Sequence, residues 1–138
     1  MAFTATKWDT AEDKAKFLKK LQAFVIQGFQ KRQFTLALYR HLINMFGHIA
    51  HYNLDGFWDH WFTDVGRQAE WLMHAKQYSA YGDPAWTWSD VERAFREWLH
   101  QPEQETLLKS LQETQASLVR AERKEIYLRL KKEFETED

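Results

Sequence analysis

The sequence has no cysteine, only two prolines and five glycines among 138 residues, and no apolar run as long as a membrane span. The lack of cysteine excludes disulfides, thiolate zinc fingers, iron–sulfur clusters and a cysteine nucleophile. Residues 1–16 lack the apolar core of a signal peptide. Lysine and arginine number 19 and aspartate and glutamate 20, so no global field attracts nucleic acid or anionic membranes. We therefore expect one cytoplasmic domain over residues 1–138, with no membrane partner.

Residues that favour strands are also scarce: leucine and alanine number 14 each, but valine and isoleucine only 4 each. This composition predicts an all-α, single-domain helical bundle. Apolar spacing predicts about five helices, at residues 10–31, 34–51, 57–78, 90–100 and about 102–134. The last is long and highly charged, and residues 113–138 are the part that would extend as a helical arm.

Local signals set the ends of these helices. Asp9 or Thr10 can cap the first helix, and the segment 53–56 has residues that favour a stop after the second. Residues 79–88 contain a glycine and a proline and show no period, which predicts a loop. Ser89–Glu92 then fits a capping box for the fourth helix.

Charge is uneven along the chain, because residues 1–33 hold seven basic and three acidic side chains. The lysines, Lys14 among them, fit the solvent face of an amphipathic helix, so we do not expect a nucleic-acid partner. In the last helix, a heptad started at Leu107 and Leu111 decays at Thr114 and Glu125, so a long coiled coil is not predicted. The remaining apolar residues there indicate contact with a neighbour or a second subunit.

Four of the six histidines lie between positions 41 and 60, which gives the sequence its one candidate for chemistry. His48 and His51 are about 4.5 Å apart along a helix and can share one ion. A third ligand would come from Asp55, Asp59 or His60, giving a zinc or iron site with an open position for water. The competing interpretation is that His48 and His51 occupy the solvent face of helix 34–51.

Aromatic residues are unusually numerous: 10 Phe, 7 Trp and 5 Tyr. Trp58, Trp61 and Trp71 spread over more than one face of the predicted helix 57–78, so one seam cannot bury them all. The loop 79–88 adds further rings, Tyr81, Trp86 and Trp88. Together these six side chains predict a partner-binding surface. Trp88 has an alternative role, since it precedes the fourth helix and can fold back onto the bundle as a hydrophobic staple.

The first hypothesis for function is a non-enzymatic protein-binding or accessory module with a tryptophan-rich surface. Its partner would be another protein or a second copy of itself, giving a homo-oligomer, and it would use no cofactor. The alternative is a metal-dependent hydrolase built on the histidine cluster, in which a neighbouring carboxylate activates a metal-bound water.

Overall fold

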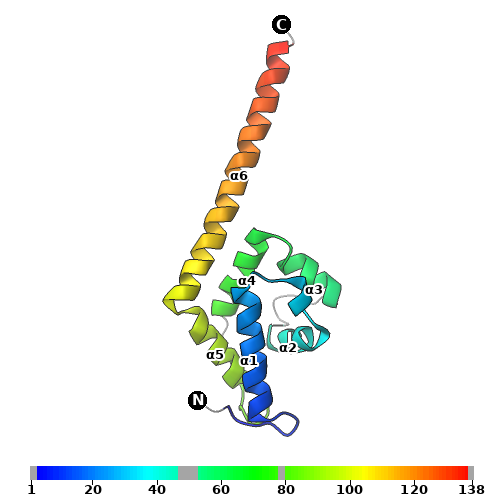
Figure 1. The fold of residues 1–138 in the computed structure, drawn as a ribbon, viewed down its shortest axis with the longest axis vertical. Helices are drawn as coiled ribbons and strands as arrows, with labels where there is room; N and C mark the ends of the chain where they lie inside the picture. The colour runs from blue at the N-terminus through cyan, green and yellow to red at the C-terminus, as the bar shows by residue number, and fades with distance from the viewer. Residues whose placement is uncertain (1–2, 47–52, 78–79, 137–138) are drawn as a thin grey trace.

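The computed structural model describes residues 3–46, 53–77 and 80–136, and this part of the chain is all-helical, with no strand. Its elements are α1 (Ala11–Ile26), the 3-10 helix η1 (Lys31–Gln33), α2 (Leu36–Phe46), α3 (Leu54–Trp61), α4 (Val65–Gln77), α5 (Ser89–Leu99) and α6 (Pro102–Thr136). Helices α1 to α5 form a head, and α6 runs along the head and projects far beyond it (Figure 1). The predicted all-α bundle with a long C-terminal helix is confirmed. The predicted helix 34–51 is present as α2, and its end lies outside the described residues.

The first helix is shorter than the predicted range 10–31, because the backbone turns left-handed after Ile26. Gly28 has φ +86° and Phe29 has φ +58°. The amide of Phe29 donates to the carbonyl of Phe24 at 2.9 Å, and their rings pack edge to face with centroids 5.3 Å apart. This is a Schellman C-cap, which satisfies helix carbonyls and folds an aromatic ring back onto the last turn.

The predicted helix 57–78 is two helices, so the structure has six α-helices where about five were expected. Asn53 begins α3 and does not merely end the segment before it, since its Oδ1 accepts a hydrogen bond from the Gly56 amide at 2.7 Å. Asp64 starts α4 in the same way, accepting from the Arg67 amide at 3.1 Å. Side-chain caps of this kind compete with helix continuation, and here they redirect the chain.

Most of the aromatic residues lie in one continuous core. The Phe24 ring contacts the rings of Phe29, Phe34, Trp58 and Phe62, with centroid distances between 5.0 and 6.4 Å. The buried cluster also includes residues from all of α1 to α5, among them Phe17, Leu21, Val25, Leu38, Leu42, Phe57, Trp61, Trp71, Leu72, Ala75, Val91, Phe95 and Leu99. Edge-to-face and stacked ring pairs let a small bundle hold this much aromatic area.

Helix α6 has 35 residues and is therefore about 52 Å long. Its first turns pack on α4, where Leu107, Leu108 and Leu111 contact the core. Gly66 allows this close approach, because a Cβ there would lie 2.8 Å from the Gln115 side chain. No helix in the described ranges combines the length and the apolar character needed to cross a bilayer.

Candidate functional site

The predicted metal site is not assembled by the residues that the structure describes. Asp55 and Asp59 are exposed, and His60 packs its ring against Trp61 at 4.4 Å. Within residues 3–46, 53–77 and 80–136, no three His, Cys, Asp or Glu side chains are placed to hold an ion. His48 and His51, the central pair of the prediction, lie outside the described residues.

Half of the six side chains predicted to form a partner-binding surface lie in the core. Trp58, Trp61 and Trp71 are all buried, with Trp71 fully enclosed, so these three side chains cannot meet a partner. The prediction was wrong because it assigned them to one helix packed along a single seam. The turn between α3 and α4 directs their rings into the same core from two directions.

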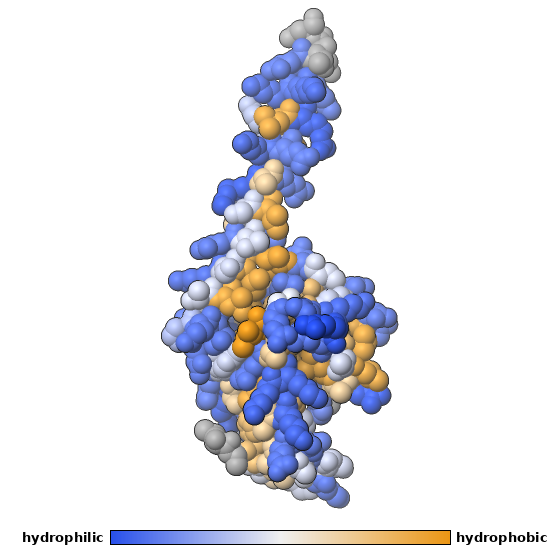
Figure 2. Space-filling model, in the orientation of Figure 1, coloured by the Kyte–Doolittle hydropathy of each residue, from blue (hydrophilic) through white to orange (hydrophobic). Residues whose placement is uncertain are grey.

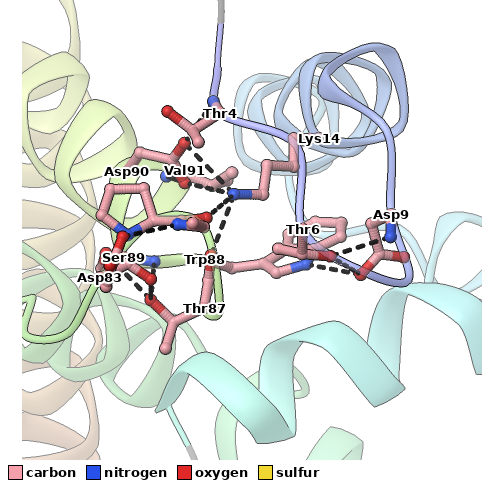
Figure 3. Close-up of polar contacts among 12 residues, drawn as sticks. Thr4, Thr6, Asp9, Lys14, Asp83, Thr87, Trp88, Ser89, Asp90 and Val91 are labelled. Atoms are coloured by element: carbon pink, nitrogen blue, oxygen red, sulfur yellow. Dashed lines mark hydrogen bonds and ion pairs between the residues drawn. The ribbon is translucent and has the colours of Figure 1, made fainter.

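A buried lysine anchors the loop that carries the remaining tryptophans. Lys14 on α1 has no exposed surface, although its position in the sequence fits a solvent face. Its Nζ donates to the carbonyls of Pro84 and Thr87, both at 2.9 Å, and forms an ion pair with Asp90 at 3.0 Å (Figure 3). The backbone amide of Thr4 donates to the same carboxylate at 3.0 Å. Every donor of the buried ammonium thus has a partner, as burial of a charge requires.

The start of α5 differs from the predicted capping box of Ser89 and Glu92. Trp88 occupies the N-cap position, and its side chain makes no capping hydrogen bond. Ser89 is the first helical residue, and its hydroxyl donates to the carbonyl of Gly82 at 3.0 Å. The Thr87 hydroxyl donates to Ser89 Oγ at 3.1 Å. The serine therefore stabilises the loop and does not cap the helix.

Trp88 packs back onto the bundle, as its alternative interpretation predicts. Its ring stacks on His41 with centroids 4.1 Å apart and meets Phe17 edge to face at 5.3 Å. Its Nε1 donates to the Asp9 carboxylate at 3.0 Å. These contacts join α1, α2 and the loop, so the role of Trp88 is internal packing and not partner binding.

His41 forms part of a cleft of about 230 Å³ between α1 and α2. Burial lowers the pKa of the His41 imidazole, and the nearby carboxylates of Asp9 and Asp13 oppose this effect. Hydrogen bonds from the Thr10 backbone and side chain lower the pKa of Asp13. The cleft has both lysines and carboxylates at its rim, and its charges do not select one class of ligand.

Two indoles remain exposed, at the end of the head where α1 begins. Trp8 and Trp86 are 70% and 62% exposed, and their rings meet edge to face at 6.2 Å. Thr6 fixes the turn at Trp8 by accepting from its amide at 3.1 Å. Tyr81, in the same loop as Trp86, is also exposed. Tyr81 and Trp86 are thus the two predicted partner-binding residues left on the surface, and Trp8 was not predicted because it precedes any periodic segment.

A long uncovered apolar surface lies on the outer half of α6, which we define as residues 118–136. From Arg120 to Glu135 every side chain is exposed. Figure 1 shows this part of α6 clear of the other helices, and Figure 2 shows hydrophobic residues continuing along it beyond the head. Most helical stability in proteins comes from packing of an apolar face, and a contiguous exposed apolar face is typical of an interaction site.

Four of these apolar residues share one side of the helix. At about 100° per residue, and with Leu107 as zero, Ile126, Leu130, Phe134 and Tyr127 lie at about 100°, 140°, 180° and 200°. We call these four residues the α6 stripe. Tyr127, Leu130 and Phe134 line a shallow depression on the helix surface. The stripe is an apolar face over residues 126–134, and no described residue of the head covers it.

No family model, curated protein or solved structure matches the chain. The geometry of the described residues is therefore the basis for assigning a function. Its exposed apolar features include the Trp8–Trp86 pair and the α6 stripe. Of the two, the stripe is the longer surface and has the regular form of a helix-pairing face.

Proposed function

We propose that the protein is a non-enzymatic accessory module that acts by binding, and that it associates with a second copy of itself through the α6 stripe. The observation that carries this proposal is the complete exposure of α6 from Arg120 to Glu135 while it keeps an apolar face. A helix that projects from a folded head with such a face is typical of helix pairing. The exposed Trp8–Trp86 pair supports a further contact of the head with a protein partner.

The strength of this association can be estimated from exposure. Ile126, Tyr127, Leu130 and Phe134 are 45%, 62%, 48% and 67% exposed. Full burial of such side chains contributes about 1.5–3 kcal/mol each, so covering the exposed parts on two copies contributes roughly 7–13 kcal/mol. The loss of translational and rotational freedom opposes this gain by about 4–15 kcal/mol. We therefore expect a dissociation constant no tighter than about 0.2 µM.

Sedimentation equilibrium between about 10 and 300 µM tests the proposal in the range where such a complex forms. The native chain should show a concentration-dependent increase in mass, and the double variant Ile126→Glu/Leu130→Glu should remain monomeric. The matched control is Ala121→Glu/Leu128→Glu, which adds the same charges to exposed positions at about 320° and 300°, away from the stripe. A native chain that stays monomeric, or equal loss in both double variants, would refute the proposal. Circular dichroism confirms that α6 is still helical in each variant.

The metal-dependent hydrolase remains an alternative that no contact among the described residues favours. Its described candidates, Asp55, Asp59 and His60, do not form a ligand cluster with other such residues there. Elemental analysis of the purified protein tests the remaining pair of candidate ligands, His48 and His51.

A further inference from the structure

We propose that the two copies pair with their α6 helices parallel and in register, an inference that rests on the proposed function. The two long edges of the α6 stripe have opposite charge. Glu122 and Glu133 lie at about 60° and 80°, on one side of the apolar arc, and Arg120 and Lys131 lie at about 220° and 240°, on the other. One face of a single helix thus has an acidic edge and a basic edge on the two sides of an apolar arc, and Arg123, at about 160°, lies within that arc one turn before Ile126.

Charge at the edges of a helix pair determines its orientation. In a parallel pair, the acidic edge of each helix faces the basic edge of its partner. In an antiparallel pair, the acidic edge faces the partner's acidic edge and the basic edge faces the partner's basic edge. Parallel pairing of α6 therefore places Glu122 beside the partner's Arg120 and Glu133 beside the partner's Lys131. In each case the two residues are two positions apart, about 3 Å along the axis, which charged side chains can span without a shift of register. Antiparallel pairing would place acidic edges together and basic edges together.

One ion pair within α6, Glu125–Arg129, lies outside the apolar arc. Arg129 Nη2 lies 3.3 Å from Glu125 Oε1, and both residues are outside the apolar arc, at about 40° and 0°. Leu107, Leu111 and Leu108 lie at about 0°, 40° and 100°, so the stripe, centred near 150°, is turned from them by about 50° to 150°, and Ile126 lies about 22 Å further along the axis than Leu111. A partner helix can therefore lie along the stripe without meeting α4 of the same chain. Parallel pairing would place both heads at the same end of a two-helix rod.

Single-cysteine cross-linking tests the orientation, because the chain has no cysteine of its own. The variants are Val119→Cys and Leu130→Cys, about 16 Å apart along the axis, with Leu128→Cys on the far side of the helix as control. A disulfide requires Cα atoms within about 7 Å, so a parallel pair brings both test cysteines within reach of their own copies, and an antiparallel pair brings at most one. Mild oxidation is followed by non-reducing electrophoresis at concentrations where the native chain is dimeric.

Parallel pairing predicts that Val119→Cys and Leu130→Cys each form covalent dimers at least about fivefold faster than Leu128→Cys. If either test variant is no faster than the control, the parallel arrangement is overturned. When the native chain still dimerises in sedimentation, that result refutes only the orientation, and the binding function stands. A native chain that is monomeric in sedimentation refutes both proposals.

Discussion

Replacement of Lys14 by methionine tests the most unusual feature of the head. The side chain is fully buried, and its Nζ contacts two loop carbonyls and the Asp90 carboxylate, which is itself only 14% exposed. Methionine has a similar length and apolar stem but removes the charge and all of the donors. The substitution thus leaves the carboxylate of Asp90 without its counter-ion and leaves the carbonyls of Pro84 and Thr87 without a donor.

The expected loss follows from these contacts. Removing one member of a buried ion pair costs about 3–5 kcal/mol, since the remaining charge stays largely shielded from water. The Thr4 and Val91 amides, at 3.0 Å from the Asp90 carboxylate, limit the penalty toward the lower part of this range. For a chain of this size, a loss of 3 kcal/mol lowers the midpoint of thermal unfolding by about 10 °C. Indole fluorescence should also change, because the loop anchored by Lys14 carries Trp86 and leads into Trp88.

Urea unfolding followed by circular dichroism at 222 nm measures the free energy of unfolding for each variant. Lys19→Met is the matched control, as Lys19 lies on the same helix with its side chain exposed. We expect this control to change stability by no more than about 0.5 kcal/mol. If Lys14→Met lowers the free energy of unfolding by less than about 1 kcal/mol, the ammonium is not bound in the buried site, and Lys14 does not anchor the loop.

Two further predictions concern titration and metal. Lowering the pH from about 7.5 to 5.5 should reduce the free energy of unfolding, because burial lowers the pKa of folded His41 below its unfolded value, and the unfolded chain then binds the proton more readily. This pH slope, measured by chemical denaturation, should be smaller in His41→Phe, which keeps a ring against Trp88; an unchanged slope would contradict the role of His41. Protein purified without chelator should contain no stoichiometric zinc or iron by elemental analysis, since the described candidates form no ligand cluster. Stoichiometric metal that disappears in His48→Ala/His51→Ala would restore the hydrolase alternative.

Several elements of the head could be predicted because their signals are local. Thr10 caps α1, and it forms a reciprocal capping box with Asp13. The loop before α5 follows from its glycine and proline, and the start of α6 at Pro102 follows from the preference of proline for a first helical turn. Each of these depends on side chains within a few positions of the backbone groups they affect, so the sequence is sufficient to find them.

The break between α3 and α4 could not be predicted from periodicity, because apolar residues continue through it. Phe62 lies in the turn and is buried, so the apolar pattern shows no gap where the helix ends. The same turn determines which tryptophans are buried. A single straight helix would expose part of the set Trp58, Trp61 and Trp71, but two helices at an angle direct all three inward. The aromatic excess of the sequence is thus mostly core, and it does not by itself indicate a binding surface.

The burial of Lys14 could not be predicted either, because its partners come from distant parts of the chain. A lysine at a polar position of an amphipathic helix has the sequence pattern of a solvent-facing residue. Only the return of the loop and α5, 70 to 76 positions later in the chain, surrounds it with oxygen atoms. The partners of a buried charge are contributed by tertiary structure, and no local rule identifies them.

The outer half of α6 connects the sequence and the structure most directly to function. The head can be complete without it, since the core is formed by α1 to α5 and the first turns of α6. Selection for the stability of the head alone would not require apolar residues at 126, 130 and 134, and it would not separate acidic from basic residues on the two sides of them. Both features are explained if the face is covered by another helix, and the opposite charge of the two edges makes this face complementary to its own copy. The proposed pairing of α6 would therefore account for side chains that the fold of one chain leaves without a role.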